Sequence, residues 1–119
     1  MSRPKALVIE DDPEISNIIS LSLKNDFEIE SIMKGEDALT RLAQSIPTLI
    51  VLDLHLPDAS GLDIFSKIRA DARLDGTKII LCTADALGAL ALRDEADFIL
   101  LKPIKPSALR DLAKRLVTM

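Results

Sequence analysis

The sequence predicts an α/β fold, a doubly wound parallel sheet with helices on both faces. Four short apolar runs recur along the chain, at residues 6–9, 49–52, 79–82 and 98–101. Continuous apolar runs of this length are typical of strands that are buried on both faces of a parallel sheet. Segments with helical spacing lie between these runs, and such alternation favours a parallel sheet with covering helices.

One further strand and five helices complete the pattern. Residues 27–31 alternate apolar and polar side chains, which indicates a half-exposed strand at an edge of the sheet. Asp12 and Pro13 are typical of a helix N-cap and first helical position. Further helices are expected after Gly35 and Gly61, over part of residues 85–95, and from Pro106 onward. The fourth of the five helices should be short, because Gly88 weakens it.

Composition and charge limit the size of the domain and its partners. The chain has 119 residues, 48% of them hydrophobic, which suffices for one aliphatic core and one domain over residues 1–119. A single cysteine excludes a disulfide framework, and the net charge of −4 disfavours direct binding to nucleic acid. The longest apolar stretch, residues 86–92, is too short to span a bilayer. We therefore expect a cytoplasmic protein with no membrane partner.

Polar side chains follow the predicted strands, at the edge where parallel strands end together. They are Glu10 and Asp11 after the first strand, Asp53 after the third, Thr83 after the fourth and Lys102 after the fifth. Ligands of such folds bind beyond the carboxyl ends of the strands, so we expect these groups to converge. Clustered carboxylates repel one another, and a hard divalent cation such as Mg²⁺ relieves the repulsion. A carboxylate beside that cation and a lysine can act as a nucleophile toward a phosphoryl group.

Four motifs lie at these strand ends in a fixed order. They are LVIEDDP at residues 7–13, LDLHLPD at 52–58 with Gly61, LCTA at 81–84 and LKP at 101–103. Together they resemble, over the whole chain, the CheY-like receiver domain of two-component response regulators. The resemblance implies a flavodoxin-like sheet of five parallel strands in the order 2-1-3-4-5. It also implies a phosphoprotein that takes part in phosphorelay signal transduction.

The resemblance assigns a role to each residue of the predicted site. It implies that Asp53 accepts a phosphoryl group from a sensor histidine kinase or a histidine phosphotransfer protein. The phosphoryl oxygens would be contacted by Thr83 and Lys102, and the Lys102–Pro103 peptide would be cis. The implied Mg²⁺ ligands are Asp11, Asp53, the backbone carbonyl of His55 and, through a water, Glu10. The domain would support its own phosphorylation and dephosphorylation without being an enzyme in the usual sense.

Several residues of these motifs also have a structural interpretation. Asp12 precedes a proline and is interpreted as a helix cap, and we favour the same role for Asp85. Asp58 and Ser60 are expected to shape the turn before the third helix. Two interpretations of His55 stay open: its ring acts as a general base in hydrolysis of the acyl phosphate, or the residue offers only its carbonyl.

Two departures from the family pattern concern the output of the domain. Ile99 stands where the family usually carries Tyr or Phe, and Phe98 beside it should point to the other face of the sheet. The segment from Thr83 to Lys102 is nearly a helical turn shorter than usual, which again predicts a stunted fourth helix. Such a helix leaves apolar side chains exposed. We expect them to form a homodimer surface over the fourth helix, fifth strand and fifth helix.

Two other functions compete with the phosphoacceptor. A receiver fold that signals by binding alone, without phosphorylation, is the main alternative. A phosphatase of the haloacid dehalogenase type also uses an aspartate nucleophile, but it needs a second aspartate two residues later. Here that position is His55, which disfavours this enzyme class.

Overall fold

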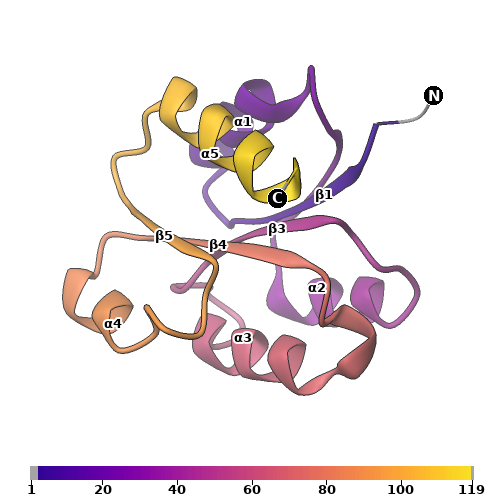
Figure 1. Cartoon of the computed structure of the whole chain (residues 1–119). Helices are drawn as coiled ribbons and strands as arrows, with labels where there is room; N and C mark the ends of the chain where they lie inside the picture. The colour runs from indigo at the N-terminus through magenta and orange to yellow at the C-terminus, as the bar shows by residue number, and fades with distance from the viewer. Residues whose placement is uncertain (1–2, 119) are drawn as a thin grey trace.

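The computed structural model describes residues 3–118, which form a parallel five-stranded sheet with helices on both faces (Figure 1). The strand order is β2-β1-β3-β4-β5, which confirms the predicted fold and topology. The strands are β1 (Lys5–Ile9), β2 (Glu28–Ile32), β3 (Leu49–Asp53), β4 (Lys78–Thr83) and β5 (Phe98–Leu101). The helices are α1 (Pro13–Leu23), α2 (Gly35–Leu42), α3 (Gly61–Ala70), a 3₁₀ turn η1 (Ala72–Leu74), α4 (Ala86–Leu90) and α5 (Pro106–Thr118).

Two apolar layers enclose the sheet. Helices α1 and α5 cover one face, and α2, α3 and α4 lie on the other (Figure 1). Successive side chains of a strand point to opposite faces, so Val8 joins the layer under α1 and α5 while Leu7 joins the other. Cys82 is buried in the first layer, where burial raises the pKa of its thiol to about 12. Cys82 is therefore a core residue.

The side chain of the preceding residue caps both α1 and α4. The carboxylate of Asp12 accepts hydrogen bonds from the amides of Glu14 and Ile15, at 2.9 and 3.3 Å. Asp85 accepts one from the amide of Gly88 at 3.0 Å and so caps α4. The cap interpretations of Asp12 and Asp85 are confirmed. Each cap satisfies amides of the first helical turn that have no partner within the helix.

The prediction that the fifth strand is buried on both faces is wrong. β5 is an edge strand, and Phe98 and Leu101 are 45% and 51% exposed. Helix α4 has five residues, as short as predicted, and it cannot cover the end of this edge. Ile99 packs against the layer under α3. Leu92, just beyond α4, is buried in the same layer. None of the described helices is both long and apolar enough to cross a bilayer.

Candidate functional site

Three carboxylates meet at the carboxyl edge of the central strands. Asp53 is the last residue of β3, and Glu10 and Asp11 follow β1. One oxygen from each of these side chains lies within 4.8 Å of the others. The two strands are parallel neighbours with Ile9 beside Leu52, so the residues that follow must emerge together. Glu10 and Asp53 are buried, whereas Asp11 is partly exposed.

Lys102 reaches these carboxylates from the far side of β4. Its Nζ lies 2.7 Å from Oε1 of Glu10 and 3.5 Å from Oδ2 of Asp53. The backbone amide of Lys102 donates to the carbonyl of Thr83 at 2.9 Å, which extends the β4–β5 pairing by one residue. The Lys102–Pro103 peptide is cis, as predicted. The five residues predicted to converge from four strand ends therefore lie along one edge of the sheet.

Burial and mutual repulsion set the charge state of this cluster. Burial raises the pKa of Glu10 to about 7, and the neighbouring Asp53 adds to the rise. A hydrogen bond from Lys102 and one from the amide of Asp12, at 3.2 Å, oppose it only in part. Burial alone would lower the pKa of Lys102, but its contacts with Glu10 and Asp53 outweigh burial and raise that pKa. Lys102 therefore stays charged at neutral pH beside carboxylates that it does not fully compensate.

The carboxylate of Asp53 is oriented by groups on both sides. The backbone amide of His55 donates to Oδ1 at 3.1 Å, and Lys102 lies next to Oδ2. The ring of His55 points outward: its side chain is 66% exposed and its Nε2 lies 4.0 Å from Oδ2 of Asp85. Thr83 is fully buried, and its hydroxyl oxygen accepts a hydrogen bond from the amide of Asp85 at 3.0 Å.

An open cavity of about 560 Å³ adjoins the cluster and is lined by Asp11 and residues 54–60. The lining loop, which we call the site loop, is residues 54–60 between β3 and α3. Its two ends meet, because the amide of Gly61 donates to the carbonyl of Leu54 at 3.1 Å. A Cβ at Gly61 would lie 2.4 Å from Cα of Leu54, so only glycine allows this close approach.

The role of Asp58 extends beyond the predicted turn before α3. Its carboxylate accepts hydrogen bonds from the amides of Gly35 and Glu36, at 2.9 and 3.2 Å, and so caps α2. Ser60 does act locally, since it accepts from the amide of Asp63 at 3.4 Å. The sequence offered one signal for the distant cap: Lys34 stands at the N-cap position of α2, and its side chain makes no cap hydrogen bond.

The donor set of the cluster fits a magnesium ion. Mg²⁺ prefers oxygen ligands, binds through one or two carboxylates and keeps several waters and phosphate oxygens in its shell. Glu10, Asp11 and Asp53 supply carboxylate oxygens, and the adjoining cavity is open to solvent and to a phosphoryl group. The excess of negative charge beside Lys102 favours a cation in the same place.

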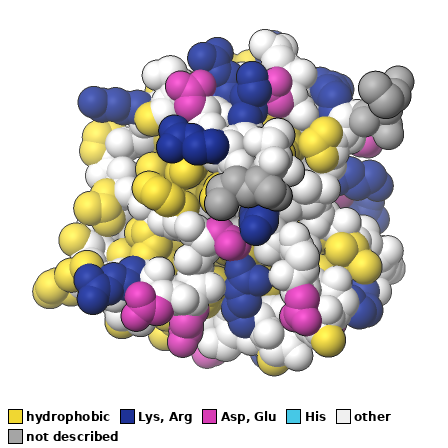
Figure 2. Space-filling model, in the orientation of Figure 1, with side chains coloured by type: hydrophobic (Ala, Val, Ile, Leu, Met, Phe, Trp, Pro, Cys, Tyr) yellow, Lys and Arg dark blue, Asp and Glu magenta, His cyan; other side chains and the backbone are white. Residues whose placement is uncertain are grey.

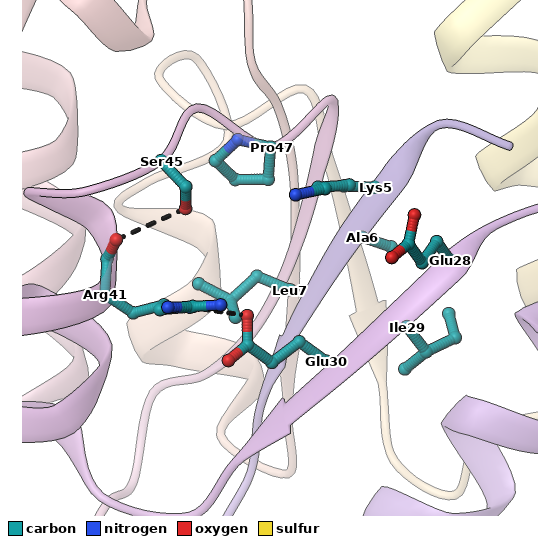
Figure 3. A pocket seen from close by; sticks show the side chains of 9 residues that line it. All are labelled: Lys5, Ala6, Leu7, Glu28, Ile29, Glu30, Arg41, Ser45 and Pro47. Atoms are coloured by element: carbon teal, nitrogen blue, oxygen red, sulfur yellow. Dashed lines mark hydrogen bonds and ion pairs between the residues drawn. The ribbon is translucent and has the colours of Figure 1, made fainter. Parts of the chain in front are cut away.

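A second cavity, of about 260 Å³, lies at the opposite, amino ends of β1 and β2 (Figure 3). Arg41 of α2 reaches across it to Glu30, with Nε 2.8 Å from the carboxylate. These two charges are exposed and pair with each other. The acidic edge is thus where unbalanced charge and buried polar groups coincide.

Comparisons with known proteins agree with this geometry. The family model of the response regulator receiver domain matches residues 6–114. The DNA-binding response regulator MtrA of Mycolicibacterium smegmatis is 35% identical over 111 residues, which cover 90% of this chain and 47% of that protein. The chain spans about half the length of the curated relatives that it matches.

Solved structures show the same relationship. The BeF3-activated receiver domain of DrrB is 29% identical, with a TM-score of 0.88 and coverage of 98% of this chain and 99% of that one. The response regulator DrrB of Thermotoga maritima, an OmpR/PhoB homologue, is 30% identical with a TM-score of 0.86; the match covers 99% of this chain and 54% of that one. The chain belongs to the response regulator receiver domain family of two-component signalling systems.

Proposed function

We propose that this receiver domain accepts a phosphoryl group on Asp53, in the presence of Mg²⁺, from a phosphohistidine. Receiver domains of response regulators are phosphorylated by histidine kinases, so the donor would be a sensor histidine kinase or a histidine phosphotransfer protein. The observation that carries the assignment is the environment of Asp53. Its carboxylate is buried, held by the His55 amide on one oxygen and flanked by Lys102 at the other.

The metal assignment rests on the same cluster. Receiver domains of this family bind Mg²⁺ at an acidic pocket, and this chain has such a cluster. We assign Asp11, Asp53 and the carbonyl of His55 as direct ligands. Glu10 would act through a water, because Lys102 already engages its carboxylate at 2.7 Å. The ion would neutralise negative charge on the phosphoryl oxygens while Asp53 approaches.

The transfer needs little covalent chemistry from the protein. An oxygen of Asp53 bonds to phosphorus as the P–N bond to the donor ring breaks, and the bonding pair returns to the ring nitrogen. The donor ring, protonated at its other nitrogen, leaves as neutral imidazole. Lys102 would stabilise charge on one phosphoryl oxygen, and the Thr83 hydroxyl would donate to another after releasing the Asp85 amide. Positioning and charge stabilisation thus supply the catalysis.

Phosphorylation by a small donor tests this function. With acetyl phosphate and Mg²⁺, the intact protein should gain the mass of one phosphoryl group, and EDTA should prevent the gain. Asp53→Asn should stay unmodified under the same conditions. Equal labelling of the Asp53→Asn variant and the native protein would refute the assignment. Absence of labelling in the native protein would favour the alternative, a receiver-fold module that signals by binding alone.

The domain should also control the lifetime of its own phosphoryl group. We propose that the acyl phosphate is hydrolysed in the isolated domain without an added phosphatase, by water that enters through the open cavity. Loss of the added mass after removal of acetyl phosphate measures this rate. We also propose that residues 1–119 form a single domain and that the protein is cytoplasmic.

A surface for self-association is the last part of the proposal. Figure 2 shows apolar side chains gathered on the side of the molecule that carries α4 and β5. The exposed large apolar side chains of these two elements are Leu87 at 82% and Leu90 at 57% in α4, and Leu101 at 51% and Phe98 at 45% in β5. Exposed apolar groups that lie close together mark contact surfaces. We propose that this face binds a second receiver domain. The contact would strengthen when the segment around Thr83 shifts on phosphorylation.

A further inference from the structure

The site loop carries the main-chain groups on which the proposed phosphoacceptor depends. The amide of His55 holds Oδ1 of Asp53 at 3.1 Å, and the carbonyl of the same residue is an assigned ligand of Mg²⁺. The loop also forms the wall of the cavity that faces Asp11. A displacement of this loop would therefore move two groups together: the amide that donates to Asp53 and the carbonyl assigned to Mg²⁺.

The base of the loop is fixed by local contacts. The amide of Gly61 donates to the carbonyl of Leu54, and His55 and Ser60 form an isolated antiparallel bridge. These contacts close the ends of the loop but do not place its tip, residues 57–59, relative to the sheet. Leu56 and Ala59 pack against the core, but apolar packing is not directional, so a polar attachment is needed to set the direction of the loop.

The tip is attached to α2, and Asp58 makes the attachment. Its two carboxylate oxygens accept from the amides of Gly35 and Glu36, at 2.9 and 3.2 Å, across 23 and 22 residues of sequence. These amides hold the pKa of Asp58 below its usual value. A Cβ on Gly35 would lie 2.8 Å from Cβ of Ala59, so the missing side chain lets α2 and the loop tip touch.

We propose that Asp58 is a positioning residue for phosphoryl transfer. By capping α2 from the tip of the site loop, it holds the His55 backbone where Asp53 and Mg²⁺ require it. The proposal deepens the proposed function and rests on it. Both oxygens of Asp58 are engaged by α2 amides, so this residue acts through the loop rather than on the reacting atoms.

Binding of Mg²⁺ depends on the exact position of each ligand. This ion requires near-ideal octahedral coordination, so a carbonyl on a pivoting loop costs affinity for the whole site. Groups that orient metal ligands typically change metal affinity or activity by about 10–100-fold when they are removed. The Asp58 contacts are partly exposed to water, which places the expected effect near the lower end, about tenfold.

Asp58→Ala is the direct test, with acetyl phosphate as donor and Mg²⁺ as the varied component. The variant should need about tenfold more Mg²⁺ for half-maximal phosphorylation, while the rate at saturating Mg²⁺ changes much less. The amide NMR resonance of His55 should shift in the metal-free protein, because its hydrogen bond to Asp53 is loosened. Asp58→Asn keeps one acceptor oxygen and should lie between the native protein and Asp58→Ala.

Two matched variants separate positioning from simple stabilisation of α2. Arg41→Gly weakens the same helix at its last turn, where Arg41 pairs with Glu30, and has no contact with the site loop. It should keep the native Mg²⁺ requirement. Asp58→Ala combined with Lys34→Ser supplies a local cap, so it should regain melting temperature yet keep the raised Mg²⁺ requirement. All rates are measured well below each melting temperature.

The outcomes are decisive in each direction. An unchanged Mg²⁺ requirement in Asp58→Ala overturns the proposal, and so does an equal rise in Arg41→Gly. Recovery of the native Mg²⁺ requirement in the Lys34→Ser double variant would show that Asp58 matters only as a helix cap. Failure of the proposed function looks different, because the native protein itself would then show no Mg²⁺-dependent phosphorylation.

Discussion

Replacing Gly61 with alanine should distort the joint between β3 and the site loop. The added Cβ would lie 2.4 Å from Cα of Leu54, 2.5 Å from its carbonyl oxygen and 2.6 Å from that of Asp53. Ordinary contacts of this kind need about 3.5 Å, so the backbone must move by about 1 Å. All three neighbours are backbone atoms, and no change of rotamer can relieve the overlap.

The cost can be worked from its parts. Overpacking of a buried site costs about 1–3 kcal/mol, and strain on the bond from the Gly61 amide to Leu54 adds about 1 kcal/mol. Alanine also reduces the conformational freedom of the unfolded chain, which offsets at most about 1 kcal/mol of this loss. The net loss is about 1–4 kcal/mol, and its middle value corresponds to a melting temperature lower by about 10 °C for a domain of this size. Because Asp53 and Leu54 move, the Mg²⁺ requirement for phosphorylation should rise as well.

Gly76→Ala is the matched control for this prediction. No atom lies within 4 Å of a Cβ at Gly76, so this change should be neutral or raise stability by about 0.5 kcal/mol. Thermal unfolding is followed by far-ultraviolet circular dichroism, since the chain has no Trp or Tyr. If the Gly61→Ala variant melts within about 2 °C of the native protein, the steric reasoning is refuted.

Three further changes test the site and its surroundings. Asp11→Ala should raise the Mg²⁺ requirement for phosphorylation more than Asp12→Ala does. Because Asp12 caps α1, Asp12→Ala should instead lower the free energy of unfolding in urea by about 1 kcal/mol. Without divalent cations, the free energy of unfolding should fall as pH rises from 4.5 to about 7, because the folded state keeps the proton on Glu10 that the unfolded state releases. The loss is at most about 3 kcal/mol, and Glu10→Gln should remove it. Leu90→Glu, at an exposed position of α4, should lower self-association of the phosphorylated protein in sedimentation experiments without slowing phosphorylation.

Each of these predictions has a contrary outcome. A greater Mg²⁺ requirement in Asp12→Ala than in Asp11→Ala would show that the metal ligand was assigned one position too early. A stability that rises between pH 4.5 and pH 7 would contradict the direction of the Glu10 shift. Native self-association in Leu90→Glu would exclude α4 from the contact surface.

The fold and most of the site follow from local features of the sequence. Continuous apolar runs mark the central strands because both faces of a parallel sheet are covered. Asp12 before Pro13 marks the start of α1 because a cap needs only neighbours in the chain. The carboxylates converge because parallel strands present their carboxyl ends to one edge, so strand order alone brings Asp53 beside Glu10.

The tertiary structure decided what depends on partners far apart in sequence. The apolar sequence of β5 predicts a buried strand, yet its position at the edge of the sheet leaves Phe98 exposed. Asp58 reads as a turn residue, yet it caps α2, because a carboxylate binds whichever free amides the fold places in reach. The contacts of Lys102 also depend on the tertiary structure. Its Nζ lies 2.7 Å from Glu10 and 3.5 Å from Asp53, and these distances are set by side-chain packing and not by residue order.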